Sequence, residues 1–572
     1  MKGEIRRGQL VTTYGVGAIV AVGDESVMVA GLDQWPTLNT EEVHEPRLER
    51  RLGVARFLLP AATDRGRDVP VVRFPRMVWC PECHRLDYFD RLALPDTNDC
   101  RFCSKGLIPS RFVAACRHCH VEDFPYFQWV HSGDAYDRSA HHELTIEMAG
   151  RTASLRDIRV QCTCRKSVTM EGVFERDALR GIARCHGRRP WLVETETACD
   201  QPLRALQRGA SNVWYSVVES SLSIPPWSEG ALLLLNRIWG FLVHVPPEVW
   251  PQTLNGLGVH RGTHYSVEDL VRVALDRRAA EQAGEASHSE PRVQEYEALT
   301  RGREPSDERQ EFVCVRADTP SRLVDWFDSV MVVKRLRELR ALRSFSRVMP
   351  PSPSDPPDYR GSLSLAEVDW LPAMEVRGEG VFLELSSTRL AAWERRPEIA
   401  ARCRTIDERY AHRFGPGRTP DRRITPRLLL IHTFAHALIN QWSLDGGYSA
   451  AGLRERLFVS DDMRGLLVFT GSSDSGGSLG GIVAQADPGR LELGVIEALQ
   501  RAEWCASDPL CSESVGSGVD SLNLAACHSC MLLPEVSCEE MNVLLDRALL
   551  TGTVERPDLG FFRPLLDGPP SP

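Results

Sequence analysis

The chain has 572 residues, of which 42% are hydrophobic and 26% charged, so it is long enough for several domains and has an ordinary globular composition. The formal net charge is −10, which excludes tight nucleic-acid binding through bulk charge alone, because phosphate binding needs a concentrated basic surface. The N-terminal residues lack the apolar core of a signal peptide, and the most apolar stretch, 231–247, is too short to span a bilayer. We therefore expect a cytoplasmic protein with reduced cysteines and no membrane contact.

The order of predicted elements divides the chain into five parts. A β-rich N-terminal unit contains two β-prone runs, 16–22 and 26–30, joined by the turn residues Gly23 and Asp24. In the last part, Thr425-Pro426 predicts the start of a helix over 428–441, and a strand is expected at 465–470. The five parts are the β-rich unit (1–75), a cysteine-rich zinc-binding region (76–215), a mostly helical block (216–349), a Pro-rich linker with a mixed segment (350–415), and a C-terminal domain (416–572).

The 17 cysteines are concentrated in two parts of the chain, ten within residues 80–199 and five within residues 505–538. The first four form two Cys-x2-Cys pairs, the spacing of a zinc ribbon in which two turns share one tetrahedral ion. Four thiolates leave no coordination position for water, so we expect a structural ion. These predicted ligands are Cys80, Cys83, Cys100 and Cys103.

The next six cysteines are more than one four-ligand site needs. Two of them, Cys116 and Cys119, could replace other ligands or pair with histidine in a third site, since His118, His120 and His186 lie close in sequence. The preferred ligands of a second zinc ion are Cys162, Cys164, Cys185 and Cys199.

The five C-terminal cysteines predict a third zinc site, so we expect two or three structural zinc ions in all. Cys505 could replace Cys511 in this set. The preferred ligands are Cys511, Cys527, Cys530 and Cys538.

Two histidines, His432 and His436, lie one turn apart on the predicted apolar helix, a spacing that suits zinc. The residues between them include no glutamate that could act as the base of a zinc hydrolase, so hydrogen-bonded core histidines are the preferred interpretation. A Gly/Ser-rich loop at 471–481 could contact phosphate or form a tight turn. The sequence contains no Gly-Lys-Ser/Thr, and a Walker-type nucleotide site is therefore absent.

The segment 334–347 carries six basic residues and one acidic residue, with an apolar residue at every third or fourth position. This pattern predicts an amphipathic basic helix that could contact a nucleic-acid backbone. Its candidate residues are Lys334, Arg335, Arg337, Arg340, Arg343 and Arg347. Arg188 and Arg189 are further candidates, because arginine beside an aromatic residue, here Trp191, suits single-strand binding. Trp191 could instead be a core residue.

Four segments resemble the DrmB family of accessory proteins from the DISARM anti-phage defence systems: RGQLVTTYGVG (7–17), QRGASNV (207–213), SSLSIPPW (220–227) and LAACHSCMLLPEVSC (524–538). The last segment also resembles the zinc-binding domain attached to some superfamily-2 DNA helicases. The resemblance implies a partner helicase of the DrmA type and a joint role in engaging DNA. It supplies no catalytic residues.

The sequence therefore predicts an α+β, multidomain protein with zinc-ribbon modules and a helicase-associated C-terminal zinc-binding domain. We expect a non-ATPase, non-enzymatic subunit that binds a superfamily-2 helicase and helps to engage DNA. The alternative is a metal-dependent nuclease or other hydrolase that uses His432 and His436 with acids such as Asp461 and Asp462. A zinc-ribbon transcription regulator is a third class, but the chain has no helix-turn-helix signature.

Overall fold

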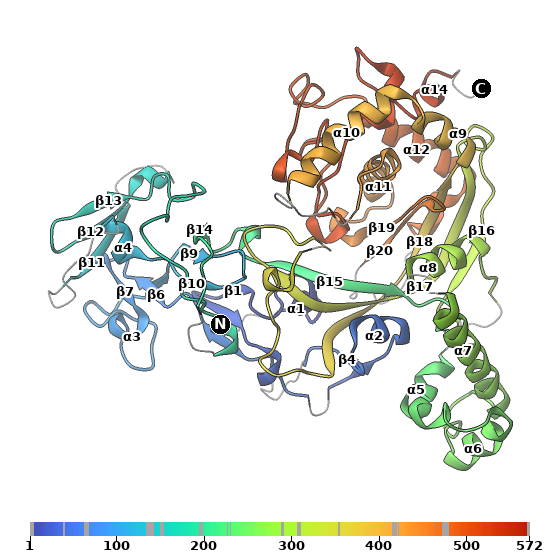
Figure 1. The fold of residues 1–572 in the computed structure, drawn as a ribbon, viewed down its shortest axis with the longest axis horizontal. Coiled ribbons are helices and arrows are strands. Elements are labelled where there is room, and N and C mark those ends of the chain that lie inside the picture. Colours follow the sequence, from blue (N-terminus) through green and yellow to red (C-terminus); the bar gives the residue numbers. More distant parts are fainter. Residues whose placement is uncertain are drawn as a thin grey trace. The chain divides into compact units, whose positions relative to one another are not determined.

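The computed structural model contains both helices and sheets, which confirms the α+β, multidomain expectation (Figure 1). None of the helices in the described part of the chain combines the length and apolar character needed to cross a bilayer. The described residues are 5–37, 40–61, 68–132, 142–148, 154–193, 198–225, 227–228, 230–287, 291–305, 310–352, 355–413, 420, 422–471 and 480–568. The Gly/Ser-rich loop predicted at 471–481 lies largely outside them.

The chain forms two compact units, and each is assembled from three separate stretches. Unit 1 comprises Met1–Val43, Leu52–Glu219 and Arg340–Met374, whereas unit 2 comprises His44–Arg51, Ser220–Leu339 and Glu375–Pro572. The boundary expected at 215 lies close to Glu219, the last residue of the second stretch of unit 1. The segment expected at 350–415 is divided between the two units after Met374.

Unit 1 begins with the predicted hairpin. Strands β1 (Ile19–Val22) and β2 (Glu25–Val29) pair antiparallel, with Val22 opposite Glu25. The two-residue turn works because Gly23 takes a positive φ of 60°, which glycine adopts without steric cost. Strand β5 (Val71–Arg73) completes the sheet on the β2 side.

The cysteine-rich part of unit 1 contains two further sheets. The larger sheet has the strand order β13-β12-β11-β7-β6-β8, and the smaller has the order β10-β9-β14. Their strands are β6 (Met77–Trp79), β7 (Arg85–Tyr88), β8 (Ile108–Pro109), β9 (Phe112–Ala115), β10 (Val121–Asp123), β11 (Leu144–Met148), β12 (Ile158–Cys162), β13 (Ser167–Thr169) and β14 (Arg204–Gln207). The helix α4 (Tyr126–Val130) packs against β12 and β13. These short elements leave many turns and loops, and most of the cysteines lie there.

The core of unit 2 is built around α11 (Pro426–Asp445), which begins where the sequence predicts it. The hydroxyl of Thr425 caps the helix by accepting the N–H of Leu428 at 3.2 Å. Apolar residues surround the whole helix, as expected of a fully buried one, and it packs against α12 (Pro488–Ala502), β19 (Leu453–Val459) and β20 (Arg464–Thr470) (Figure 1). The predicted strand at 465–470 is thus confirmed.

Further helices of unit 2 precede α11 in sequence. The expected helical block is correct for four of them, but strands occur at both of its ends. The helices are α5 (Ala231–Leu242), α6 (Trp250–Leu257), α7 (Val267–Ser287), α8 (Pro291–Arg301), α9 (Ser387–Glu394) and α10 (Pro397–His412). The strands are β15 (Tyr215–Leu222), β16 (Val313–Arg316), β17 (Phe327–Ser346) and β18 (Trp370–Leu385), which belong to the sheet β15-β17-β18-β20-β19 with β16 beside β17.

The basic segment 334–347 is not a helix. Residues up to Ser346 belong to the long strand β17, so the helix prediction is wrong. Most side chains of this strand are buried, so it lacks the alternation of apolar and polar residues that marks a half-exposed strand. The apolar residues at every third or fourth position therefore resemble the pattern of a helix. The β-branched run before Lys334 and the pairing with β16 favour the extended conformation.

Arg347 directly follows β17 and is completely buried in unit 1. Its guanidinium donates to the carbonyl oxygens of Cys119, Val213 and Gly17 at 3.0, 2.6 and 2.6 Å. Burial lowers the pKa of Arg347 to about 10. One side chain therefore joins three loops that are distant in sequence, and no part of it is available to nucleic acid.

We expect Arg347→Met to lower the free energy of unfolding of unit 1 by about 3 kcal/mol, because three buried carbonyl groups lose their donor. Chemical denaturation, followed by a probe in unit 1, measures this change. Arg343→Met is the matched control: Arg343 is 49% exposed, and its 3.2 Å pair with Glu219 should contribute less than about 1 kcal/mol. Equal effects of the two substitutions would contradict the structural role of Arg347.

Candidate metal centres

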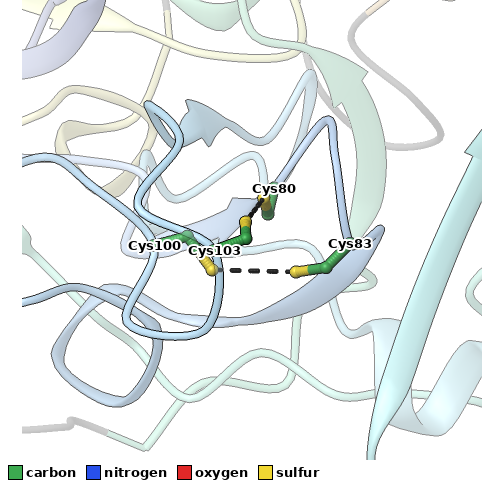
Figure 2. Close-up of side chains that lie close together, drawn as sticks. All are labelled: Cys80, Cys83, Cys100 and Cys103. Carbon is green, nitrogen blue, oxygen red and sulfur yellow. Dashed lines mark hydrogen bonds between the residues drawn. The ribbon is translucent and has the colours of Figure 1, made fainter.

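The first predicted site is assembled as the spacing indicates. Cys80 and Cys83 follow β6 in a turn, and Cys100 and Cys103 lie in a second turn that faces it (Figure 2). The Sγ atoms of Cys80 and Cys103 are 3.2 Å apart, and those of Cys83 and Cys100 are 3.7 Å apart. A disulfide would require about 2.05 Å. Four sulfurs bound to one tetrahedral ion at about 2.3 Å lie about 3.8 Å from one another, so this set could hold a metal ion.

The thiols of this site differ in acidity. Burial raises the pKa of Cys80, but hydrogen bonds from the backbone N–H of Cys83 and from Cys103 outweigh it and lower the pKa to about 7. Burial raises the pKa of Cys83 to about 12, with the neighbouring thiols adding to the rise. The Cys80 thiolate thus forms readily, and its negative charge disfavours ionisation of the neighbouring thiols. A bound cation would remove this repulsion.

The second predicted set is not brought together. Cys185 and Cys199 meet Cys116 and His120 instead of Cys162 and Cys164, so the preferred grouping is wrong. Nδ1 of His120 lies 3.4 Å from Sγ of Cys116 and 3.6 Å from Sγ of Cys185. The cause is the hairpin of β9 and β10, which places residues 116 and 120 at one end of the small sheet. The alternative in which Cys116 and Cys119 pair with histidine in a third site is met only in part, because Cys116 meets His120 in the same cluster as Cys185 and Cys199.

Cys119 does not join its sequence neighbour Cys116. Its thiol is buried and donates to the carbonyl oxygens of Tyr359 and Phe345 at 3.2 and 3.6 Å. Burial raises its pKa to about 12, which keeps it protonated. His186 is also engaged elsewhere, because its Nδ1 lies 2.7 Å from a carboxylate oxygen of Glu122.

Cys162 and Cys164 form a further cluster with two histidines that the sequence did not single out. Nε2 of His131 lies 3.3 Å from Sγ of Cys164, and Nδ1 of His142 lies 3.2 Å from Sγ of Cys162. His131 ends α4 and its other ring nitrogen lies 2.6 Å from the carbonyl oxygen of Phe127, which fixes the ring as in many metal-bound histidines. This set also could hold a metal ion.

The C-terminal cysteines form a four-thiol cluster with one exchange. Cys505 takes the place expected for Cys538, so the preferred set was wrong at one position. The Sγ–Sγ distances are 3.5 Å for Cys505–Cys527 and 3.8 Å for both Cys511–Cys530 and Cys527–Cys530. Burial alone would raise the pKa of Cys527, but backbone and thiol hydrogen bonds lower it to about 7. Cys538 instead lies beside His432, with its Sγ 3.2 Å from Nε2.

The candidate nucleic-acid residues fall into two groups. Arg337, Arg340 and Arg347 are at most 3% exposed, and Nε of Arg337 donates to Glu375 at 2.8 Å. These three cannot serve as surface contacts, which corrects the prediction. The side chains of Lys334, Arg335 and Arg343 are exposed, and Arg188 and Arg189 are half-buried. Trp191 is completely buried, and its indole N–H donates to Ser362 at 2.9 Å, so the core interpretation is confirmed.

Two comparisons with known proteins bear on this arrangement. Residues 6–215 match the model of a domain of unknown function, DUF8724. Over 566 residues the chain is 29% identical to the DISARM protein DrmB of Bacillus paralicheniformis, covering 95% of this chain and 99% of that protein. The predicted resemblance to DrmB is confirmed. The DUF8724 match ends at residue 215, close to Glu219, where the second stretch of unit 1 ends. It does not include the third stretch, Arg340–Met374.

We expect His131→Ala and His142→Ala each to lower the metal content of the purified protein by about one ion per chain, because each removes one of four ligands. Elemental analysis by mass spectrometry measures the content. His412→Ala, an exposed histidine at the end of α10, is the control and should leave it unchanged. Unchanged metal content in both test variants would contradict a metal site formed by His131, His142, Cys162 and Cys164.

Proposed function

We propose that the protein is a non-enzymatic, non-ATPase subunit of an anti-phage DISARM system that binds a superfamily-2 DNA helicase of the DrmA type and helps it to engage DNA. The observation that carries this proposal is the similarity to DrmB along nearly the whole of both chains. The lack of a Gly-Lys-Ser/Thr sequence agrees with a role in which another chain hydrolyses the nucleotide.

We assign structural zinc to the four clusters described above. The ligands are thiolates and imidazoles, which suit zinc better than magnesium or calcium, and each set supplies four of them. A filled shell leaves no position for a reacting water. The ions therefore stabilise short, loop-rich segments and their surfaces, which is the contribution expected of a scaffold subunit.

Three exposed apolar side chains, close to one another in the sequence of unit 2, support a protein partner. We name them the apolar rim: Trp504, Leu510 and Val515, which are 70%, 83% and 81% exposed. Trp504 and Leu510 directly precede the cluster cysteines Cys505 and Cys511 in sequence, so a metal-bound loop would present them rigidly. Trp504 also lines a cavity of about 320 Å³ with Arg501 and His528. Large exposed apolar side chains beside a cavity are typical of protein interfaces.

The first test is copurification with the helicase of the same defence system. We expect the paired substitution Trp504→Ala, Leu510→Asp to weaken the complex at least about tenfold, because a buried tryptophan anchor commonly contributes about 2 kcal/mol or more to binding. Leu257→Asp, at a position 53% exposed in α6, is the control and should bind normally. Wild-type protein that does not bind the helicase would refute the proposed function, and normal binding by the double variant would refute the apolar rim.

The second test concerns DNA. We expect the isolated protein, with its charge of −10, to bind DNA weakly and the helicase complex to bind it more tightly. Lys334→Ala, Arg335→Ala should reduce the slope of log affinity against log salt by about two in the complex, because each removed cation leaves one phosphate with its counterion. Arg395→Ala, Arg423→Ala removes two exposed charges that are not part of β17 and should leave the slope unchanged. Fluorescence anisotropy at several salt concentrations distinguishes these outcomes, and equal affinity with and without the helicase would contradict the joint role.

A further inference from the structure

Four potential ligands from three separate elements converge in the core of unit 2. We name them the α11 cluster: His432 and His436 on α11, Glu455 on β19, and Cys538 just after a short 3-10 helix (Glu535–Ser537). Their ligand atoms all lie within 4.8 Å of one another. Nε2 of His432 is 3.3 Å from Oε1 of Glu455, and Nε2 of His436 is 3.7 Å from the same oxygen. All four side chains are buried, and none is more than 4% exposed.

Backbone carbonyl groups orient both imidazole rings through their Nδ1 atoms. Nδ1 of His436 lies 2.8 Å from the carbonyl oxygen of Met531, and Nδ1 of His432 lies 3.3 Å from that of Leu544. A carbonyl oxygen can only accept, so each Nδ1 carries the proton. In their neutral forms, the two rings direct the lone pairs of both Nε2 atoms at the centre of the cluster. This arrangement is the usual one for metal-bound histidine, whose second nitrogen donates to a carbonyl or carboxylate.

The thiol and the carboxylate both accept hydrogen bonds from the backbone. Sγ of Cys538 accepts the backbone N–H groups of Glu540 and Asn542, both at 3.3 Å. Oε1 of Glu455 accepts the backbone N–H of Glu539 at 2.9 Å. Donors directed at sulfur and oxygen stabilise the charged forms, which are the forms that bind a cation.

Two buried polar atoms of the cluster's side chains are left without hydrogen bonds. Within the described residues, Nε2 of His436 and Oε2 of Glu455 have no hydrogen-bond partner. A buried polar atom without a partner destabilises the fold, because it has given up its hydrogen bonds to water and gained none in return. A metal-free core, in which protonated His432 donates to Glu455 or Cys538, would still leave both atoms unpaired. A cation at the centre satisfies Nε2 of His436 together with the other lone pairs directed there.

We infer that the α11 cluster binds one zinc-class divalent ion through His432, His436, Glu455 and Cys538. Two imidazoles, a carboxylate and a thiolate form a mixed set of the kind that zinc accepts and that magnesium and calcium do not prefer. Four protein ligands fill a tetrahedral shell, and the burial keeps bulk water out. The ion would fasten α11 to β19 and to the C-terminal loop, and the two histidines act as structural ligands and do not activate water.

Diffraction from crystals of the full-length protein, recorded on both sides of the zinc absorption edge, tests the site without any substitution. We expect an anomalous peak among the four side chains, within about 2.3 Å of Sγ of Cys538 and about 2.1 Å of both Nε2 atoms. An absent peak here, in crystals whose Cys505 cluster shows one, would overturn the inference.

A matched pair of cysteine variants gives a second test in solution. Cys538→Ser should lower the zinc content by about one ion per chain and should remove one thiolate-to-metal absorption component from the cobalt-substituted protein. Cys403→Ser is the control, because Cys403 is buried in the same unit but donates to the carbonyl of Ile424 at 3.1 Å. Equal zinc contents in the two variants would overturn the inference. If Cys538→Ser does not fold, the diffraction result decides.

Discussion

The constraint on which unit 1 depends is the repulsion between thiolates that lie close together. A cation bound between them would offset this repulsion. In the cysteine-rich part of unit 1, short strands and helices surround an apolar core that includes Phe112, Tyr126 and Trp129, and a smaller apolar cluster includes Cys80 and Cys100. Sulfurs at 3.2–4.0 Å carry charges that cannot all form next to one another without a cation. A metal ion bound at such a cluster would couple metal binding to folding, because the ion would hold together the loops that supply its ligands.

Buried arginines play a comparable part through hydrogen bonds to carbonyl and carboxylate oxygens. Arg347 joins three loops of unit 1 through carbonyl oxygens, and Arg456 in unit 2 makes a two-pronged pair with Glu295 at 2.7 and 2.8 Å. Such groups are expensive to bury, and their hydrogen bonds and ion pairs offset that cost. Some arginines of this acidic chain are thus buried and connect segments of the core, whereas others carry their charge at the surface. Only the latter can meet a phosphate, which reduces the basic area open to DNA.

How far the sequence predicted the metal sites depended on how local each contact is. Cys80 and Cys83 lie in one turn, so their spacing alone identifies the site. His142 meets Cys162 only because β11 and β12 pair with Leu144 opposite Cys162, and no spacing rule contains that register. Glu455 reaches the α11 cluster in the same way, from a strand that packs on the helix. The prediction of α11 succeeded because capping and uniform apolarity are local signals, whereas that of β17 failed because ion pairs to distant segments allow charged residues inside a strand.

The division of unit 1 into three stretches has a consequence for how the chain is synthesised. Arg347 and the stretch Arg340–Met374 emerge from the ribosome long after Glu219, the end of the second stretch. Until then the loops at Gly17, Cys119 and Val213 lack the donor that joins them, although the cysteines of this unit are already present and able to take up metal. Ion loading would thus precede closure of the unit. A nascent chain stalled before residue 347 would hold filled metal sites in an unfinished domain.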